Sequence, residues 1–282
     1  MYTEYMDKYV VAVSGGIDSV VLLDILSRQP GVELVVAHFD HGIRKDSNID
    51  AIFVAGLAIK YGLPFETKRE ELGPNVSEDV ARTRRYKFLR DVAKKHDAQI
   101  VTAHHADDVI ETIIINLLRG TGWRGLAVLD SDVKRLLTGI SKTEIKEYAR
   151  ANNLTWREDS TNSDDRYLRN RIRQTTAKID EDKKRQVLGL WSTQKSLKKS
   201  IKEEVTRLVG DGPLYSRYFF THIDQSSGME CLRHIVGTRL THPQLIKALH
   251  AIKTAMPHKT FDAGSGVRIY FTSRNFMVEL IK

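Results

Sequence analysis

The sequence has almost no cysteine and no long apolar run. Cys231 is the single cysteine among 282 residues, which excludes a disulfide framework and any zinc or iron–sulfur site built from cysteines. No stretch approaches the roughly 18 consecutive apolar residues of a membrane helix. The first apolar run, residues 9–13, lacks a basic segment before it and is soon followed by two glycines, so no signal peptide is expected. These absences predict a soluble, cytoplasmic protein with no membrane association.

Charge is distributed unevenly along the chain. Residues 1–173 contain 26 Lys and Arg and 26 Asp and Glu, whereas residues 174–282 contain 18 and 10, so the formal charge of +8 lies entirely in the last part. A neutral front part and a basic back part suggest that chemistry occurs in front and that a polyanion is held behind. The alternative interpretation is that the positive charge serves only solubility.

The front part alternates short apolar runs with amphipathic segments, which is typical of an α/β fold with a doubly wound parallel sheet. Strands are expected at residues 9–13, 34–39, 64–67, 99–103 and 134–137. Helices are expected at residues 18–26, 48–61, 77–95, 107–118 and 141–152.

The back part has a different character. Residues 181–209 predict one long or broken helix, residues 243–255 a second helix, and residues 267–281 a terminal β-hairpin. The linker is expected at residues 172–179. The predicted domains are therefore residues 1–176 and a smaller, mainly helical domain over residues 177–282 that ends in the hairpin.

The strongest local signal is the segment Ser14-Gly15-Gly16-Ile17-Asp18-Ser19, between a buried strand and a helix. Two glycines allow a sharp turn, and the first helix amides with the hydroxyls of Ser14 and Ser19 can hold a phosphate. The segment is neither a Walker A loop nor a complete dinucleotide fingerprint. Because Asp18 would repel a phosphate unless a cation lay between them, the segment implies Mg²⁺ bound by Asp18.

Three carboxylates follow the strand expected at residues 99–103. Asp107, Asp108 and Glu111 are spaced to share one helix face, at the carboxyl end of a strand, where open α/β sheets bind ligands. Such a cluster repels itself unless Mg²⁺ or an ammonium group joins it. Of the two histidines just before it, His104 is the one that we expect to face the site.

Together these segments resemble the bacterial tRNA(Ile)-lysidine synthetase family of PP-loop ATP pyrophosphatases, in family order over residues 10–173. The resemblance is specific, although Arg135 stands where the family usually has proline. It is carried by the loop and by residues 38–44, 78–89, 103–112, 118–122 and 156–173, the last with Asp159, Ser160, Asn162, Arg169, Asn170, Ile172 and Arg173.

The resemblance implies a Rossmann-like domain and a ligase that modifies tRNA. Members of the family use ATP to adenylate the C2 oxygen of the wobble cytidine of tRNA(Ile) with a CAU anticodon, and pyrophosphate is released. The ε-amine of L-lysine then displaces AMP to give lysidine. The implied partners are ATP with Mg²⁺, lysine and this tRNA, which the basic domain of residues 177–282 would bind, and some members are homodimers.

Roles in the site follow from the same resemblance. It implies ATP binding by Ser14, Gly15, Gly16, Ile17, Asp18, Ser19, His38 and His104. It implies catalytic roles for Asp18, Arg82, Asp107, Asp108 and Glu111. Arg82 would stabilise the departing pyrophosphate, and Asp108 and Glu111 would also bind lysine. Which of the three clustered carboxylates accepts the amine proton stays open.

Three alternatives also stay open. Related tRNA thiolases generally use cysteines to carry sulfur or a cluster, which Cys231 alone does not provide. Amidating relatives usually have an ammonia-generating domain. A non-catalytic RNA-binding module would have no reason to keep a cluster of like charges together.

Overall fold

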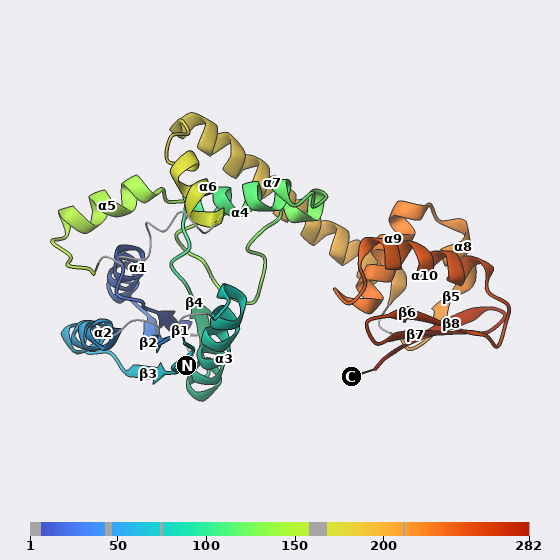
Figure 1. Ribbon diagram of the computed structural model, residues 1–282, viewed down its shortest axis with the longest axis horizontal. Helices are drawn as coiled ribbons and strands as arrows, with labels where there is room; N and C mark the ends of the chain where they lie inside the picture. Colours follow the sequence, from blue (N-terminus) through green and yellow to red (C-terminus); the bar gives the residue numbers. More distant parts are fainter. Residues whose placement is uncertain (1–6, 43–46, 74–75, 158–167, 211, 282) are drawn as a thin grey trace, which may run out of the picture. The chain divides into compact units, whose positions relative to one another are not determined.

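The computed structural model describes residues 7–42, 47–73, 76–157, 168–210 and 212–281 (Figure 1). It divides into two compact units, Met1–Lys195 (unit 1) and Ser196–Lys282 (unit 2). The boundary falls inside helix α7 (Glu181–Val209), not at residues 176 and 177. The reason is that the first half of α7 packs on unit 1, where Trp191 Nε1 donates a hydrogen bond to the carbonyl of Val128 at 3.0 Å. The expected linker falls partly in helix α6 (Leu168–Thr176).

Unit 1 contains the expected parallel sheet, with the strand order β3-β2-β1-β4. The strands are β1 (Asp7–Ala12), β2 (Val32–Asp40), β3 (Phe65–Arg69) and β4 (Gln99–Val101). The prediction of a fifth strand at residues 134–137 is wrong, because these residues do not form a regular strand. They contribute two isolated parallel bridges, Val101 to Lys134 and His105 to Leu137, because β4 ends at Val101 and offers no further ladder.

Alternation along the central strands directs side chains to two cores. Val11 and Val36 pack with helices α1 (Ile17–Ser27), α2 (Ser47–Tyr61) and α5 (Lys142–Ala151). Val10 and Val35 pack on the other face with α3 (Glu78–His96). Figure 1 shows α1 and α2 on one side of the sheet and α3 on the other. Because both faces are covered, the central runs of β1 (residues 9–12) and β2 (residues 34–37) are apolar, whereas the edge strand β3 is mostly polar and exposed.

A buried carboxylate joins three of these helices. Asp24 of α1 is 2% exposed and accepts hydrogen bonds from Tyr61 of α2 at 2.7 Å and from Tyr148 of α5 at 2.8 Å. Burial alone would raise the pKa of Asp24, but these bonds and the Arg28 guanidinium hold it below its usual range. Asp24 therefore stays charged and fixes α2 and α5 against α1.

Helices α4 (Ala106–Leu118) and α6 and the first half of α7 complete unit 1 beyond the end of β4, together with the short 3-10 helix η1 (Trp123–Gly125). Helix α4 begins directly after the bridge at His105, so its first turn lies at the carboxyl edge of the sheet. That edge is where the candidate site forms.

Unit 2 packs three helices against an antiparallel sheet with the order β5-β8-β7-β6. The predicted terminal hairpin is confirmed as β7 (Val267–Phe271) and β8 (Asn275–Leu280), and the predicted second helix as α10 (His242–Thr254). The sequence prediction missed β5 (Tyr215–Ser216), α8 (Arg217–His222), α9 (Gln225–Val236) and β6 (Thr260–Gly264). In the described parts of both units, no helix combines the length and apolar character needed to cross a bilayer.

Candidate functional site

The loop between β1 and α1 has the form of an anion-binding turn. Gly15 has a φ of +92°, which glycine adopts without strain, and Ser19 Oγ donates to the carbonyl of Gly16 at 2.8 Å. The amide of Ser14 donates in turn to Ser19 Oγ at 3.2 Å. Gly16 is the N-cap of α1, and no described side chain caps the helix. The first amides of α1 are therefore directed at a ligand position beside Asp18.

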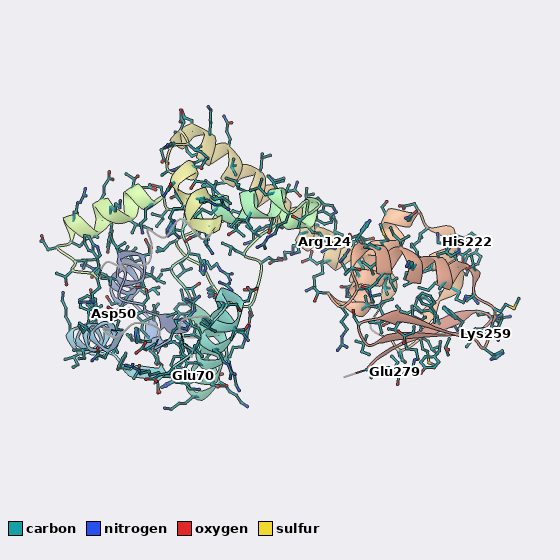
Figure 2. The ribbon with its side chains drawn as sticks, viewed as in Figure 1. Asp50, Glu70, Arg124, His222, Lys259 and Glu279 are labelled. Atoms are coloured by element: carbon teal, nitrogen blue, oxygen red, sulfur yellow. The ribbon has the colours of Figure 1, made fainter. Side chains whose placement is uncertain are left out.

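This loop borders a cavity of about 820 Å³ within unit 1. Ser14, Gly16, Ile17 and Asp18 form its loop side, and the lining also includes the carboxylates of Asp50 from α2 and of Asp107 and Glu111 from α4. Asp50 projects from α2 (Figure 2) and pairs with Arg157 at 2.5 Å. Cationic side chains that also line the cavity are Arg85, Lys142, Lys146, Arg150, Arg157 and Arg173. Both signs of charge thus face one space.

The three carboxylates predicted as a cluster do come together at the start of α4, and all are buried. Asp107 Oδ1 lies 2.9 Å from Lys184 Nζ of α7, and its Oδ2 accepts the backbone amide of Lys142 at 2.8 Å. Asp108 Oδ2 accepts the amide of His105 at 3.0 Å. The cluster is therefore anchored by neighbours from α5 and α7 that are distant in sequence.

Two guanidinium groups of α6 neutralise the rest of the cluster. Arg169 donates to Asp108 Oδ1 at 3.1 Å and to Glu111 Oε2 at 3.2 Å. Arg173 Nε donates to Glu111 Oε1 at 3.1 Å. The sequence left Mg²⁺ and a ligand ammonium as the cations that would relieve repulsion, and in this structure the chain's own arginines and lysines do so.

Lys142 connects the loop to the cluster. Its Nζ lies 2.5 Å from Asp18 Oδ1, while its backbone amide reaches Asp107. Lys142 is the first residue of α5, capped by Ser141, so the amino ends of α1 and α5 both face the cavity. Two helix dipoles and an ammonium group then favour anions at this end of the space.

The buried pairs stay charged across the neutral range. Burial would raise the pKa values of Asp107 and Asp108, but Lys184 and the Lys142 amide hold the first low, and the His105 ring and amide hold the second low. Burial would lower the pKa values of Lys184 and Arg173, and their carboxylate partners raise both. Asp107 and Asp108 are thus carboxylates held by cations and amides, not neutral acids.

Some predicted residues lie outside this cavity. His105 lines it, whereas His104 does not, and the His104 Nδ1 forms a hydrogen bond with Thr102 Oγ1 at 2.8 Å. Burial lowers the pKa of His104 to about 3, so this ring is neutral. His38 is buried, and its Nδ1 is hydrogen-bonded to the carbonyl of Val13 at 2.8 Å. The histidine that borders the cavity is therefore the second of the pair, because it directly precedes α4.

The basic helix α3 contributes a different arginine from the predicted one. Both guanidinium groups lie over the ring of Tyr86, at 4.8 Å from its centroid for Arg82 and 5.4 Å for Arg85, but only Arg85 is among the residues that line the cavity. Arg82 still adds positive charge near His104. The two arginines are three residues apart and therefore share one side of α3, so the sequence could not separate them.

The sequence prediction also missed the cations that complete the site. Arg169 and Arg173 lie in the segment of residues 156–173 that carries the family resemblance, but the sequence did not indicate a function for them. No motif in the neighbouring sequence distinguishes Lys142 or Lys184 from other lysines. Of the other residues quoted for that segment, Asp159, Ser160 and Asn162 lie outside the described residues, as do Ile43 and Arg44 of an earlier one.

The loop offers one carboxylate, that of Asp18, as a ligand for Mg²⁺. In the described part of the chain, no group of three or more His, Cys, Asp or Glu side chains is arranged to hold a metal ion. Asp18 is the single carboxylate of the loop, and its side chain is 31% exposed beside the helix amides. Mg²⁺ commonly takes one or two carboxylates and completes its shell with phosphates and water. Asp18 therefore suits an ion that a phosphate ligand brings with it.

Comparisons with known proteins agree with this geometry. The PP-loop domain family matches residues 3–179. A tRNA(Ile)-lysidine synthase from Thermus thermophilus is 43% identical over 176 residues, which cover 59% of this chain and 34% of that protein. One from Thermotoga maritima is 38% identical over 180 residues, covering 59% and 44%. The chain thus matches less than half the length of these curated relatives.

A solved structure supports the fold. The U34-tRNA thiolase of Methanococcus maripaludis, determined with its [4Fe-4S] cluster, superposes with a TM-score of 0.56 at 17% identity, over 68% of this chain and 72% of that one. The family match spans the loop, the sheet and the carboxylate cluster, which together form most of unit 1. The chain belongs to the PP-loop family, and this membership implies that it uses ATP.

Proposed function

We propose that the protein is an ATP-dependent ligase that joins L-lysine to C2 of the wobble cytidine of tRNA(Ile) with a CAU anticodon, through an adenylated cytidine. The observation that supports it best is that the loop and two carboxylates of the cluster, Asp107 and Glu111, line one cavity, and that Lys142 contacts both Asp18 and Asp107. Asp108 is not part of the lining. The identity to curated lysidine synthases over the same residues supports the choice of substrates.

The loop end of the cavity suits the triphosphate of ATP. The uncapped amides of α1 would hold the phosphates, and the Lys142 ammonium would turn from Asp18 to the same anion. Mg²⁺, when bound by Asp18 and the phosphates, would neutralise part of the charge on the leaving pyrophosphate. Arg85 and the amino end of α5 add further positive charge around that group.

The carboxylate end suits a cationic substrate. Asp108 and Glu111 accept guanidinium N–H groups at 3.1 to 3.2 Å, and the ammonium of a lysine substrate would donate to carboxylate oxygens of the same kind. An amine must lose a proton before it attacks, and one of the clustered carboxylates of Asp107, Asp108 and Glu111 would accept it. Positioning of the amine and removal of its proton would then occur at one group of residues.

A thiolase is the second candidate, and the chain's chemistry disfavours it. A [4Fe–4S] cluster is held by several cysteine thiolates. Cys231, the single cysteine of this sequence, is buried in unit 2, where burial raises the pKa of its thiol. The likeness to the archaeal thiolase is therefore one of fold.

The proposal is tested by incorporation of radiolabelled lysine into this tRNA with ATP and Mg²⁺, measured together with pyrophosphate release. Pyrophosphate is expected only with the tRNA present, and incorporation only with a C34 wobble base. Asp18→Ala and Asp108→Ala are each expected to lower incorporation by at least 100-fold. Asp91→Ala, an exposed carboxylate of α3, is the matched control and should keep normal activity.

Two results would contradict the proposal. One is incorporation by either site variant within a few-fold of the wild type at saturating ATP. The other is pyrophosphate release that needs a sulfur donor or ammonia in place of lysine. Near-UV circular dichroism of each variant should match the wild type, so that a loss of activity is not a loss of fold.

A further inference from the structure

A second cavity lies wholly within unit 2, at the corner where β5 meets α8. Its volume is about 760 Å³, and its lining includes Arg217, Tyr218 and His222 of α8, Arg274 of the β7–β8 turn and Asn275, the first residue of β8. The described residues that line it include two arginines and one histidine but no carboxylate. The space is therefore suited to an anionic or electron-rich ligand.

Tyr218 and His222 form an aromatic platform at this cavity. Their ring centroids are 4.0 Å apart, with 32° between the planes, and His222 Nδ1 is hydrogen-bonded to the carbonyl of Tyr218 at 2.8 Å. This bond and the one-turn spacing fix the two rings together. Tyr218 is nevertheless 72% exposed, so a wide aromatic surface is open to a stacking partner.

Only one of the two arginines is open to a ligand. Arg217 donates from Nε, Nη1 and Nη2 to the carbonyls of Ile252, Thr272 and Ala255, at 2.6 to 3.0 Å, and so it holds the cavity wall together. Arg274 is exposed at the turn. The cavity thus offers one exposed guanidinium beside an aromatic platform.

We infer that this cavity binds one unpaired nucleotide of an RNA, with its base stacked on Tyr218 and its phosphate at Arg274. The inference rests on the proposed function for the kind of polymer. Sequence-tolerant recognition of single-stranded RNA combines aromatic stacking with a cation for the backbone. An AMP or ATP molecule would carry two or more negative charges, for which one exposed arginine is a poor match, whereas a phosphodiester carries one.

The charge of unit 2 favours a polymer as well. Residues 196–282 contain 13 Lys and Arg against 7 Asp and Glu. Lys259, exposed two residues after the cavity residue Pro257, lies toward the same end of unit 2 as His222 (Figure 2). A neighbouring phosphate of the same strand could therefore be neutralised beyond the cavity, which a free nucleotide would not use.

The test measures binding of the full chain to a single-stranded eight-nucleotide RNA that carries one 2-aminopurine, whose fluorescence falls on stacking. Tyr218→Ala is expected to raise Kd about tenfold and to abolish the fluorescence change, since stacking on one aromatic side chain typically changes affinity by this order. Tyr218→Phe should keep both. Leu208→Ala, which removes another exposed apolar side chain of unit 2, should change neither.

Charge is tested separately. Arg274→Gln is expected to weaken binding and to lower the salt dependence by about one counterion, whereas Lys247→Gln, an exposed lysine of α10 outside the cavity, should leave the fluorescence change intact. The inference is overturned if Tyr218→Ala binds within twofold of the wild type. It is also overturned if AMP at equal concentration displaces the RNA, or if a duplex of the same sequence binds equally well and in the same Tyr218-dependent way.

These outcomes are separable from the proposed function. If the wild type incorporates lysine into tRNA but Tyr218→Ala binds the oligonucleotide normally, the cavity inference alone fails. If the wild type incorporates no lysine while the Tyr218-dependent stacking is present, the ligase proposal fails and the RNA site stands.

Discussion

Lys184 and Asp107 form an ion pair of 2.9 Å in which neither side chain is more than 10% exposed. Lys184 belongs to α7 and Asp107 to the first turn of α4, 77 residues earlier in the chain. The pair therefore fixes α4, which carries the carboxylate cluster, against α7.

Removal of this lysine should destabilise unit 1. Lys184→Met leaves a buried carboxylate with only the Lys142 amide as donor, and loss of one partner of a buried pair costs about 3 kcal/mol or more. Denaturant titration followed by tryptophan fluorescence reports unit 1, because Trp123, Trp156 and Trp191 all lie in it. Lys183→Met, at the exposed neighbouring position, should change stability by less than about 0.5 kcal/mol. Equal midpoints for the two variants would contradict the assignment.

The two glycines Gly15 and Gly56 should respond in opposite ways to alanine. Gly15 has a φ of +92°, and an added Cβ would lie 3.3 Å from the ring of Phe53, so Gly15→Ala should cost about 1 to 2 kcal/mol and weaken ATP binding. Gly56 lies inside α2 with open space around it, so Gly56→Ala should stabilise by about 0.5 to 1 kcal/mol. Thermal unfolding and ATP titration of both variants check this, and a stabilised Gly15→Ala would show that the loop is not strained for other residues.

Lys142 should contribute directly to ATP affinity. Lys142→Met removes the ammonium beside the loop and leaves Asp18 unpaired next to the phosphates, so Kd for MgATP should rise about tenfold or more. Lys142→Arg keeps the charge and should stay within about threefold, as expected for a charge-assisted contact. Isothermal titration in the absence of tRNA isolates this step from catalysis. An unchanged Kd for the methionine variant would mean that Lys142 acts only on Asp18.

The low pKa of the buried His104 ring predicts that the stability of the fold depends on pH. Its folded pKa is about 3, against about 6.5 when unfolded, so protons bind the unfolded chain more strongly between these values. Stability is complete above pH 7 and falls as the pH decreases, by about 2 kcal/mol at pH 5 for this one group. His104→Gln should flatten the slope between pH 7 and 5, and the exposed His250→Gln should not. His41, whose pKa burial and Arg85 also lower, accounts for a slope that persists.

Affinity for tRNA should depend on α7 more than on α3. Replacing Lys195, Lys198, Lys199 and Lys202 by glutamine should weaken tRNA binding. It should also reduce the slope of the logarithm of the binding constant against the logarithm of the salt concentration by about two to four, because about one counterion fewer is released for each phosphate contact that is lost. Full-length chains are required, since a truncation at residue 176 would remove Lys184 and Trp191 from unit 1. The comparison is a second quadruple variant, in which glutamine replaces four cationic residues of α3: Arg84, Lys87, Arg90 and Lys94. A larger loss in that variant would place the RNA surface on α3.

The fold could be predicted wherever the signal was local. Buried runs such as residues 9–13 can form little else than core strands, and the 29 residues of α7 have helical composition throughout. The segment at residues 134–137, Lys-Arg-Leu-Leu, was expected to be a strand, but strand formation also needs a partner, and β4 is only three residues long. Pairing is a property of two segments, so one segment could not reveal it.

The site was predictable to the same extent. The loop and the spacing of Asp107 and Glu111 are local patterns, and the structure brings both to one cavity. The lysine partners of Asp18 and Asp107 come from 35 to 124 residues away, and a lone Lys142 or Lys184 resembles any surface lysine in sequence. The choice between His104 and His105 depended on where β4 ends and α4 begins, which is the least certain part of any such prediction.

Helices α1 and α5 are cross-linked twice, and the spacing of the two links is the same on both. Asp18 pairs with Lys142 at the site, and Asp24 accepts the Tyr148 hydroxyl in the core, six residues further along each helix. The two helices therefore run parallel and are joined at two levels. The Asp18–Lys142 link lies at the cavity, and the Asp24–Tyr148 link lies in the core. Because the Asp24–Tyr148 link sets the register of the two helices, the proposed movement of the Lys142 ammonium from Asp18 to a phosphate would need only a rotation of its side chain and no shift of the loop backbone.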